Sequence, residues 1–187
     1  MAEDKNEDFI ITYSKLKFSP IAGKAEHIDV IDIAHALSLM CRANGHIKHF
    51  YSVAQHSLNC ALEAKVRGLP DRIQLACLLH DASEAYLSDI TRPVKRSLPK
   101  YMEYEDVLQT VIYRKFFTED LTERELLYVK GIDDAMLYYE LLELMDEPIF
   151  AKAPELQSLP DFRQREFQEV EKEFIRLFDS LFNKSTL

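Results

Sequence analysis

The chain has 187 residues, of which 47% are hydrophobic and 29% are charged, with only 4 glycines and a net charge of −9. This length and composition predict one globular domain and exclude intrinsically disordered and fibrous proteins. Four glycines are too few for the glycine-rich loops that bind phosphate in dinucleotide-binding and P-loop proteins. The negative charge also argues against a nucleic-acid duplex as the partner, because duplex phosphates require a basic surface.

The longest apolar runs, such as Leu75 to Leu79, are far shorter than the ~18 residues of a membrane-spanning helix. The acidic first residues, Met1 to Asp8, lack the apolar core of a secretion signal. The three cysteines contain no Cys-x-x-Cys pair, which favours buried, reduced thiols; they are Cys41, Cys60 and Cys77. We therefore expect a cytoplasmic protein that does not associate with membranes.

The first predicted element is a short strand at Phe9 to Tyr13, which can form a small hairpin with Lys15 to Ser19. Beyond it, apolar residues recur mostly with the period of 3.6 residues that is typical of helices. The first three predicted helices begin at Asp29 or Asp32, at Ser52 and at Asp71. They end near Asn44-Gly45, at Gly68 and towards Ser83.

A loop with prolines and basic residues is predicted for about 88–99, followed by helices at about 99–116, 122–145 and 160–182. Thr122 and Glu125 have the spacing of a capping box, which marks the start of the second of these helices. The predicted fold class is therefore all-α, a single-domain helical bundle over residues 1–187 with at most a small N-terminal β-hairpin. Its motif-bearing core covers about residues 13–145, and its C-terminal helix about 160–182.

Two histidines and several carboxylates can converge in this bundle. His56 lies in the second predicted helix, and His80 with Asp81 lies in the third, so an antiparallel helix pair can bring them to one point. A later helix carries Asp133 and Asp134 among apolar neighbours, where a carboxylate needs a strong partner such as a cation. Two imidazoles and two carboxylates suit Mn²⁺, Fe²⁺, Co²⁺ or Mg²⁺ better than a closed tetrahedral zinc site.

Glu84 stands four residues after His80 and three after Asp81, which predicts a common helix face. A glutamate so close to a bound cation can transfer protons as a general acid or base. Each of these residues alone also fits a structural role, such as a hydrogen-bonded core histidine or a solvated glutamate. The prediction of a metal centre therefore depends on the whole set.

The pattern of His56, His80-Asp81 and Asp133 resembles the H…HD…D signature of the HD-domain metal-dependent phosphohydrolases. Five further segments fit one subgroup, which includes bacterial 5′-deoxynucleotidases and phage dATP triphosphohydrolases: Asp32 to Ser38, Cys41-Arg42, Tyr51 to Ser57, Leu79 to Ala85 and Arg92 to Lys95. Gly45-His46 and Asp89 also fit this subgroup. The resemblance covers about Tyr13 to Glu140, which is most of the chain.

The resemblance implies one divalent metal ion, of Mn, Co, Fe, Mg or Zn, bound by four side chains: His56, His80, Asp81 and Asp133. It also implies that Glu84 handles protons and that Asp89 orients substrate or water. In the family the fourth ligand usually stands three residues after a lysine and seven before a glutamate. Lys130 and Glu140 then select Asp133, and the adjacent Asp134 is the alternative.

Two basic clusters in this acidic chain can attract an anionic substrate. They are Arg92, Lys95, Arg96 and Lys100, and Arg42, His46, Lys48 and His49. We expect Arg42 and Lys95 to bind phosphate and His46 to contact the phosphate or the sugar. Ala43 stands where relatives often carry an aromatic residue, so the base preference stays open.

These patterns predict a metal-dependent phosphohydrolase that acts on small-molecule (deoxy)nucleotides, with 5′-deoxynucleoside monophosphates ahead. The alternatives are a deoxynucleoside triphosphate triphosphohydrolase and a non-catalytic helical module that binds a metal or a nucleotide. The C-terminal helix carries an aromatic stripe, which can serve the core or a subunit contact. Since the family commonly forms homo-oligomers, we expect a dimer or a larger assembly.

Overall fold

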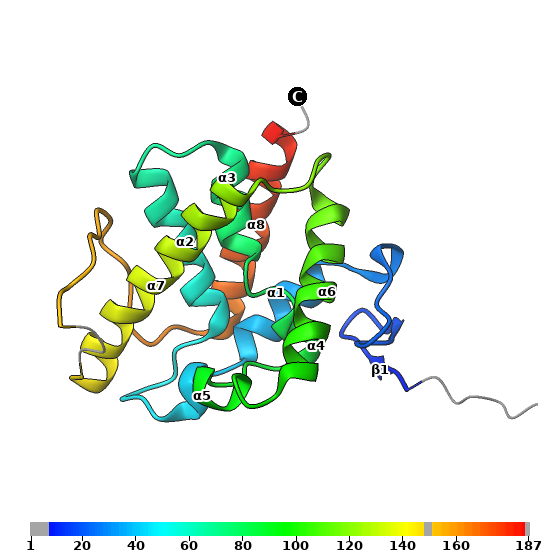
Figure 1. The fold of residues 1–187 in the computed structure, drawn as a ribbon, viewed down its shortest axis with the longest axis horizontal. Helices are drawn as coiled ribbons and strands as arrows, with labels where there is room; N and C mark the ends of the chain where they lie inside the picture. The colour runs from blue at the N-terminus through cyan, green and yellow to red at the C-terminus, as the bar shows by residue number, and fades with distance from the viewer. Residues whose placement is uncertain (1–7, 148–150, 186–187) are drawn as a thin grey trace, which may run out of the picture.

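The computed structural model describes residues 8–147 and 151–185, so most of the acidic N-terminal segment considered above lies outside the described residues. The fold is mostly helical, with one small N-terminal hairpin, as the sequence predicted (Figure 1). In this hairpin β1 (Ile10–Ile11) pairs antiparallel with β2 (Lys17–Phe18).

The helices follow in chain order. The first five are the 3₁₀ turn η1 (Ala25–His27), α1 (Val30–Leu39), the 3₁₀ turn η2 (Arg42–Gly45), α2 (Val53–Val66) and α3 (Asp71–Leu79). The others are the short α4 (Glu84–Leu87) and α5 (Arg92–Lys95), then α6 (Pro99–Phe116), α7 (Glu123–Met145) and α8 (Phe167–Ser185).

Side-chain caps fix where the principal helices begin. The Asp29 side chain accepts a hydrogen bond from the Ile31 backbone at the start of α1. Ser52 and Gln55 form a capping box at the start of α2. The predicted capping box of Thr122 and Glu125 is present at α7. These local signals explain why the predicted starts of α2 and α7 agree with the structure.

The centre of the fold is the pair α2 and α3, whose residues are almost all buried. α7 packs against both of these helices, and α8 packs against α1 and α3 (Figure 1). One hydrophobic cluster extends from Phe18 in the hairpin to Leu181 in α8. In α8, Phe174 and Phe178 belong to this core, so the aromatic stripe of the C-terminal helix serves core packing.

α3 ends at Leu79, four residues before the predicted end at Ser83. The reason is a tertiary contact, because Gln109 of α6 donates a hydrogen bond to the Leu79 carbonyl and accepts one from the Ser83 backbone. Residues 80–83 therefore form a turn, and Glu84 begins a separate short helix. The predicted common helix face of His80 and Glu84 is wrong.

Other elements also differ from the prediction. α1 ends at Leu39 and a separate turn, η2, follows, with Ala43 in the left-handed region at φ 52°. α8 begins at Phe167, because Gln55 and Asn59 of α2 bind the backbone of the preceding segment and hold it outside the helix. The short helix α5 lies within the predicted basic loop.

Within the described residues, no helix is long and apolar enough to span a membrane.

Candidate metal centre

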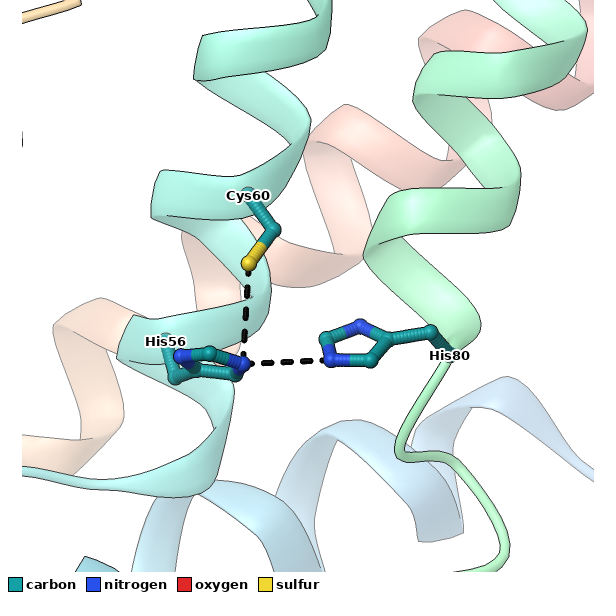
Figure 2. A group of neighbouring side chains, drawn as sticks. All are labelled: His56, Cys60 and His80. Carbon is teal, nitrogen blue, oxygen red and sulfur yellow. Dashed lines mark hydrogen bonds between the residues drawn. The ribbon is translucent and has the colours of Figure 1, made fainter. Parts of the chain in front are cut away.

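The two histidines of the predicted centre meet between α2 and α3. His56 lies in the first turn of α2 and is fully buried, and His80 immediately follows α3. Their Nε2 atoms are 3.1 Å apart, as Figure 2 shows. The two helices therefore run antiparallel, and the sequence prediction that they bring these side chains to one point is confirmed.

Two carboxylates reach the same point. Asp133 Oδ1, from α7, lies 3.3 Å from His56 Nε2 and 3.8 Å from His80 Nε2. Asp81 Oδ2 lies 3.3 Å from His80 Nε2 and 3.7 Å from His56 Nε2. Two atoms that each lie ~2.1 Å from one ion are about 3.0 Å apart at a right angle and about 3.4 Å apart in a tetrahedron. Each aspartate oxygen thus lies at nearly the spacing of two ligands of one ion from both histidine nitrogens.

Asp134, the alternative fourth ligand, faces a different set of partners. Its carboxylate pairs with Lys130 Nζ at 2.8 Å and with Arg92 Nη1 at 2.9 Å. Neither histidine is among these partners. Of the two adjacent aspartates, the structure brings Asp133 to the histidines.

The Nδ1 atoms of both histidines have hydrogen-bond acceptors. His56 Nδ1 lies 2.6 Å from Glu140 Oε1, and His80 Nδ1 lies 2.8 Å from the backbone carbonyl of Cys77. These acceptors hold the Nδ1 proton of each ring, so Nε2 can bind a metal in place of a proton. In the sequence pattern, Glu140 is only a spacing marker for Asp133. Its position seven residues, or two helical turns, after Asp133 was the signal that both lie on one face of α7.

Electrostatics favour the ionised forms of Asp133 and Glu140. Burial alone would raise the pKa of Asp133, but hydrogen bonds from His56 and His80 hold it well below its usual range. The pKa of Glu140 is also lowered despite its burial, because Arg42, His56 and Tyr51 stabilise the charged form. Carboxylates must be deprotonated to bind a metal, so this environment fits a cation.

A thiol also lies at the histidine pair. Cys60 Sγ is 3.5 Å from His56 Nε2, and the donor atoms of His56, Cys60 and His80 all lie within 4.8 Å of one another, close enough to hold a metal ion (Figure 2). Burial raises the pKa of Cys60 to about 11, so the group is a neutral thiol at neutral pH. The sequence analysis treated Cys60 only as a buried cysteine, although its spacing of four residues after His56 predicts a shared helix face.

Glu84 lies at the start of α4 and is almost completely buried. Its Oε1 is 3.4 Å from Lys95 Nζ, and its Oε2 has no hydrogen-bond partner among the described residues. Burial and the charges of Asp81 and Asp89 raise the pKa of Glu84 well above its ordinary value. Lys95 is held by a second carboxylate, since its Nζ lies 2.6 Å from Glu105 Oε1. Glu84 is therefore a carboxyl group that binds a proton more readily than an exposed glutamate does.

Arg42, a predicted phosphate ligand, lies against the carboxylates of the centre. Its Nη1 is 3.3 Å from Asp81 Oδ2 and its Nη2 is 3.2 Å from Glu140 Oε2. Its side chain is 13% exposed, so the guanidinium lies mostly below the surface. In this arrangement Arg42 compensates the charges of the buried Glu140 and the half-buried Asp81, a role that the sequence pattern did not predict.

The other two predicted site residues occupy different environments. Asp89 is partly buried, and this burial raises its pKa although Arg42 counteracts the effect. It follows Ser88, whose φ of 81° and ψ of 150° are costly for a residue other than glycine. His46 is exposed after η2, and no hydrogen bond or ion pair of the described residues joins its side chain to the centre.

No protein-family model matches this chain. The chain is 41% identical over 108 residues to the uncharacterized protein YfdR of Escherichia coli (strain K12), a match that covers 58% of each protein. It is 42% identical over 94 residues to the uncharacterized protein RCAP_rcc00048 of Rhodobacter capsulatus, which covers 48% of each. The chain thus spans about half the length of the curated relatives it matches.

Proposed function

We propose that this protein is a divalent-metal-dependent phosphohydrolase that acts on nucleotides, with 5′-deoxynucleoside monophosphates as its substrates. One observation carries the proposal: two imidazole nitrogens lie 3.1 Å apart, and two carboxylate oxygens from separate segments each lie 3.3 to 3.8 Å from both nitrogens. The donors belong to His56, His80, Asp81 and Asp133. This set fits Mn²⁺, Co²⁺, Fe²⁺ or Mg²⁺. It also fits Zn²⁺, which would leave fewer coordination positions open. The resemblance to HD-domain phosphohydrolases supports the same reaction.

A bound divalent ion would neutralise phosphoryl oxygens and lower the pKa of a water molecule. The protein's own residues prepare the site for this chemistry. Glu140 and the Cys77 carbonyl orient the two imidazoles through Nδ1. The histidines and aspartates present their donors without rearrangement, which preserves binding energy for the substrate.

Glu84 is the proposed proton-transfer residue. The free Oε2 can accept a proton from the attacking water, while Lys95 holds the other oxygen in place. The same carboxyl can return the proton to the leaving oxygen of the nucleoside. General acid and base catalysis of this kind contributes ~10²- to 10⁴-fold to the rate. We infer that Asp89 helps to orient the water or the sugar.

Arginine and lysine side chains near the centre supply charge for the phosphate. Lys95 and Arg42 are proposed to bind the phosphate, as the sequence predicted. His46 is exposed and would contact a substrate only at the surface of the protein. Arg92 joins them as a candidate, because its guanidinium is 43% exposed and lies 2.9 Å from Asp133 Oδ2. A phosphate bound beside the ion could take over one of these guanidinium groups from its carboxylate partner.

Glu84 also favours an enzyme over a non-catalytic metal-binding module. A buried carboxylate oxygen without a hydrogen bond costs ~1–3 kcal/mol or more, which a purely structural metal site has no reason to maintain.

The protein would act in the cytoplasm, where its three free cysteines stay reduced. We also propose that it forms a homo-oligomer. Triphosphohydrolysis of deoxynucleoside triphosphates is the second candidate reaction on the same residues.

A substrate panel tests the proposal. The protein, supplied with Mn²⁺, Co²⁺ or Mg²⁺, is incubated with ribo- and deoxynucleoside mono- and triphosphates, and phosphate, pyrophosphate and triphosphate are resolved. We expect inorganic phosphate from deoxynucleoside monophosphates. Triphosphate released from dATP would establish the second reaction, and the absence of any metal-dependent product would refute the proposal.

A further inference from the structure

We propose that Cys60 gives the centre a second set of ligands, in which His56, His80 and the Cys60 sulfur bind a thiophilic divalent ion such as Zn²⁺. This inference rests on the proposed function. It adds that the identity of the bound metal determines which side chains coordinate it. Oxygen-preferring ions would use the two aspartates, and thiophilic ions would use the sulfur. The centre would thereby discriminate between metals.

The distances suit such a set. A tetrahedral zinc ion with ~2.3 Å to sulfur and ~2.05 Å to nitrogen separates sulfur from nitrogen by about 3.6 Å and the two nitrogens by about 3.4 Å. The corresponding separations are 3.5 Å between Cys60 Sγ and His56 Nε2, and 3.1 Å between the two Nε2 atoms. The His80 donor atom lies within 4.8 Å of the sulfur, so these two side chains move closer together when they bind one ion. Figure 2 shows the Cys60 sulfur and the His80 Nε2 atom both directed towards His56 Nε2.

The surrounding structure holds these donors in place. His56 and Cys60 lie one turn apart on α2 and are 0% and 1% exposed. His80 is fixed by its hydrogen bond to the Cys77 carbonyl. Binding therefore requires only small movements of side chains in a packed core. Coordination replaces the S–H bond by a sulfur–metal bond and releases one proton to solvent.

The aspartates have other cationic partners when the sulfur binds the ion. Asp133 Oδ2 lies 2.9 Å from Arg92 Nη2, and Asp81 Oδ2 lies 3.3 Å from Arg42 Nη1. A carboxylate that leaves the ion would stay compensated by an arginine, so the change avoids the large cost of an unpaired buried charge. The Cys60 thiol, by contrast, has His56 as its one hydrogen-bond partner among the described residues.

Metal titration of the full chain tests the inference. Apoprotein is titrated with Co²⁺ and Cd²⁺, and the near-ultraviolet band of sulfur-to-metal charge transfer is recorded. We expect the band in the wild type and in the Cys41→Ser/Cys77→Ser double variant, which retains Cys60 as its one cysteine. Cys60→Ser and Cys60→Ala should abolish the band and weaken Cd²⁺ binding ~10- to 100-fold, with little effect on Mn²⁺.

Each contrary result has a distinct meaning. A wild type that binds Cd²⁺ without the band, or a double variant that loses it, overturns the role of Cys60 and leaves the proposed phosphohydrolase intact. These two measurements do not depend on the folding of a Cys60 variant. If neither Mn²⁺ nor Cd²⁺ binds the wild type, the metal centre itself is refuted, and the proposed function fails together with this inference.

Discussion

Replacing Glu140 by glutamine is expected to weaken metal binding although Glu140 is not a proposed ligand. The carboxylate is 3% exposed, and its Oε1 lies 2.6 Å from His56 Nδ1 and accepts a hydrogen bond from Tyr51 at 2.9 Å. Its Oε2 pairs with Arg42 Nη2 at 3.2 Å. Glutamine keeps the shape of the side chain, but it removes the charge and turns one acceptor into a donor.

The magnitude follows from these contacts. A hydrogen bond to a charged group contributes ~1.5–3 kcal/mol, and loss of a partner that orients a metal ligand costs ~10- to 100-fold in affinity. The two estimates agree, because tenfold corresponds to ~1.4 kcal/mol. Arg42 keeps Asp81 as a partner, so we expect the free energy of unfolding to fall by less than the ~3–5 kcal/mol of a fully broken buried pair.

Calorimetric titration with Mn²⁺ measures the effect on affinity, and chemical denaturation measures the effect on stability. Glu143→Gln is the matched control, because Glu143 lies on the exposed side of the same helix. We expect Glu140→Gln to bind Mn²⁺ ~10- to 100-fold more weakly than the control. A folded Glu140→Gln protein with the affinity of the wild type would refute the role assigned to this carboxylate.

Three further substitutions test other parts of the molecule. Glu84→Ala should keep its metal and lose at least ~10² in kcat; a normal kcat would remove Glu84 from catalysis. Lys95→Ala should raise KM more than it lowers metal content, and an unchanged KM would argue against phosphate binding there. Burial would raise the pKa of Glu63, but hydrogen bonds involving Ser158, Arg67 and Gln157 lower it. The ionised carboxylate therefore stabilises the fold at pH values above ~4.3, the pKa of a glutamate in the unfolded chain. Glu63→Gln should therefore cost ~1–3 kcal/mol at pH 7 and progressively less as the pH falls below about 4; a cost that does not depend on pH would contradict this.

Local signals in the sequence were sufficient for most of the helices. Periodicity and capping residues predicted α6 and α7 to within a residue, because these signals lie in the same segment that they organise. The end of α3 depends on Gln109, which is 30 positions away from Leu79 in the chain. The start of α8 likewise depends on α2. Pattern analysis of one segment does not contain such contacts.

In the candidate site, too, local spacing predicted some features, and contacts between distant segments determined others. The spacing of His56 and His80 predicted their approach, since one helix hairpin connects them. Asp133 and Asp134 differ by ~100° around one helix; the spacing of the resembled family favours Asp133, and the packing of α7 against α2 and α3 brings Asp133 to the histidines. The contacts of Glu140 and Cys60 with His56 also required the folded structure, although both residues had suggestive spacing.

Metal content and phosphate release, measured on the same preparations of the wild type, Asp133→Ala and Asp134→Ala, test most directly whether this centre is a metal-dependent nucleotide phosphohydrolase. We expect the wild type and Asp134→Ala to bind one divalent ion and to release phosphate from a deoxynucleoside monophosphate. Asp133→Ala should lose both, and chelation should abolish turnover by the wild type. A wild type that keeps full activity when it is chelated and free of metal would contradict the proposed function.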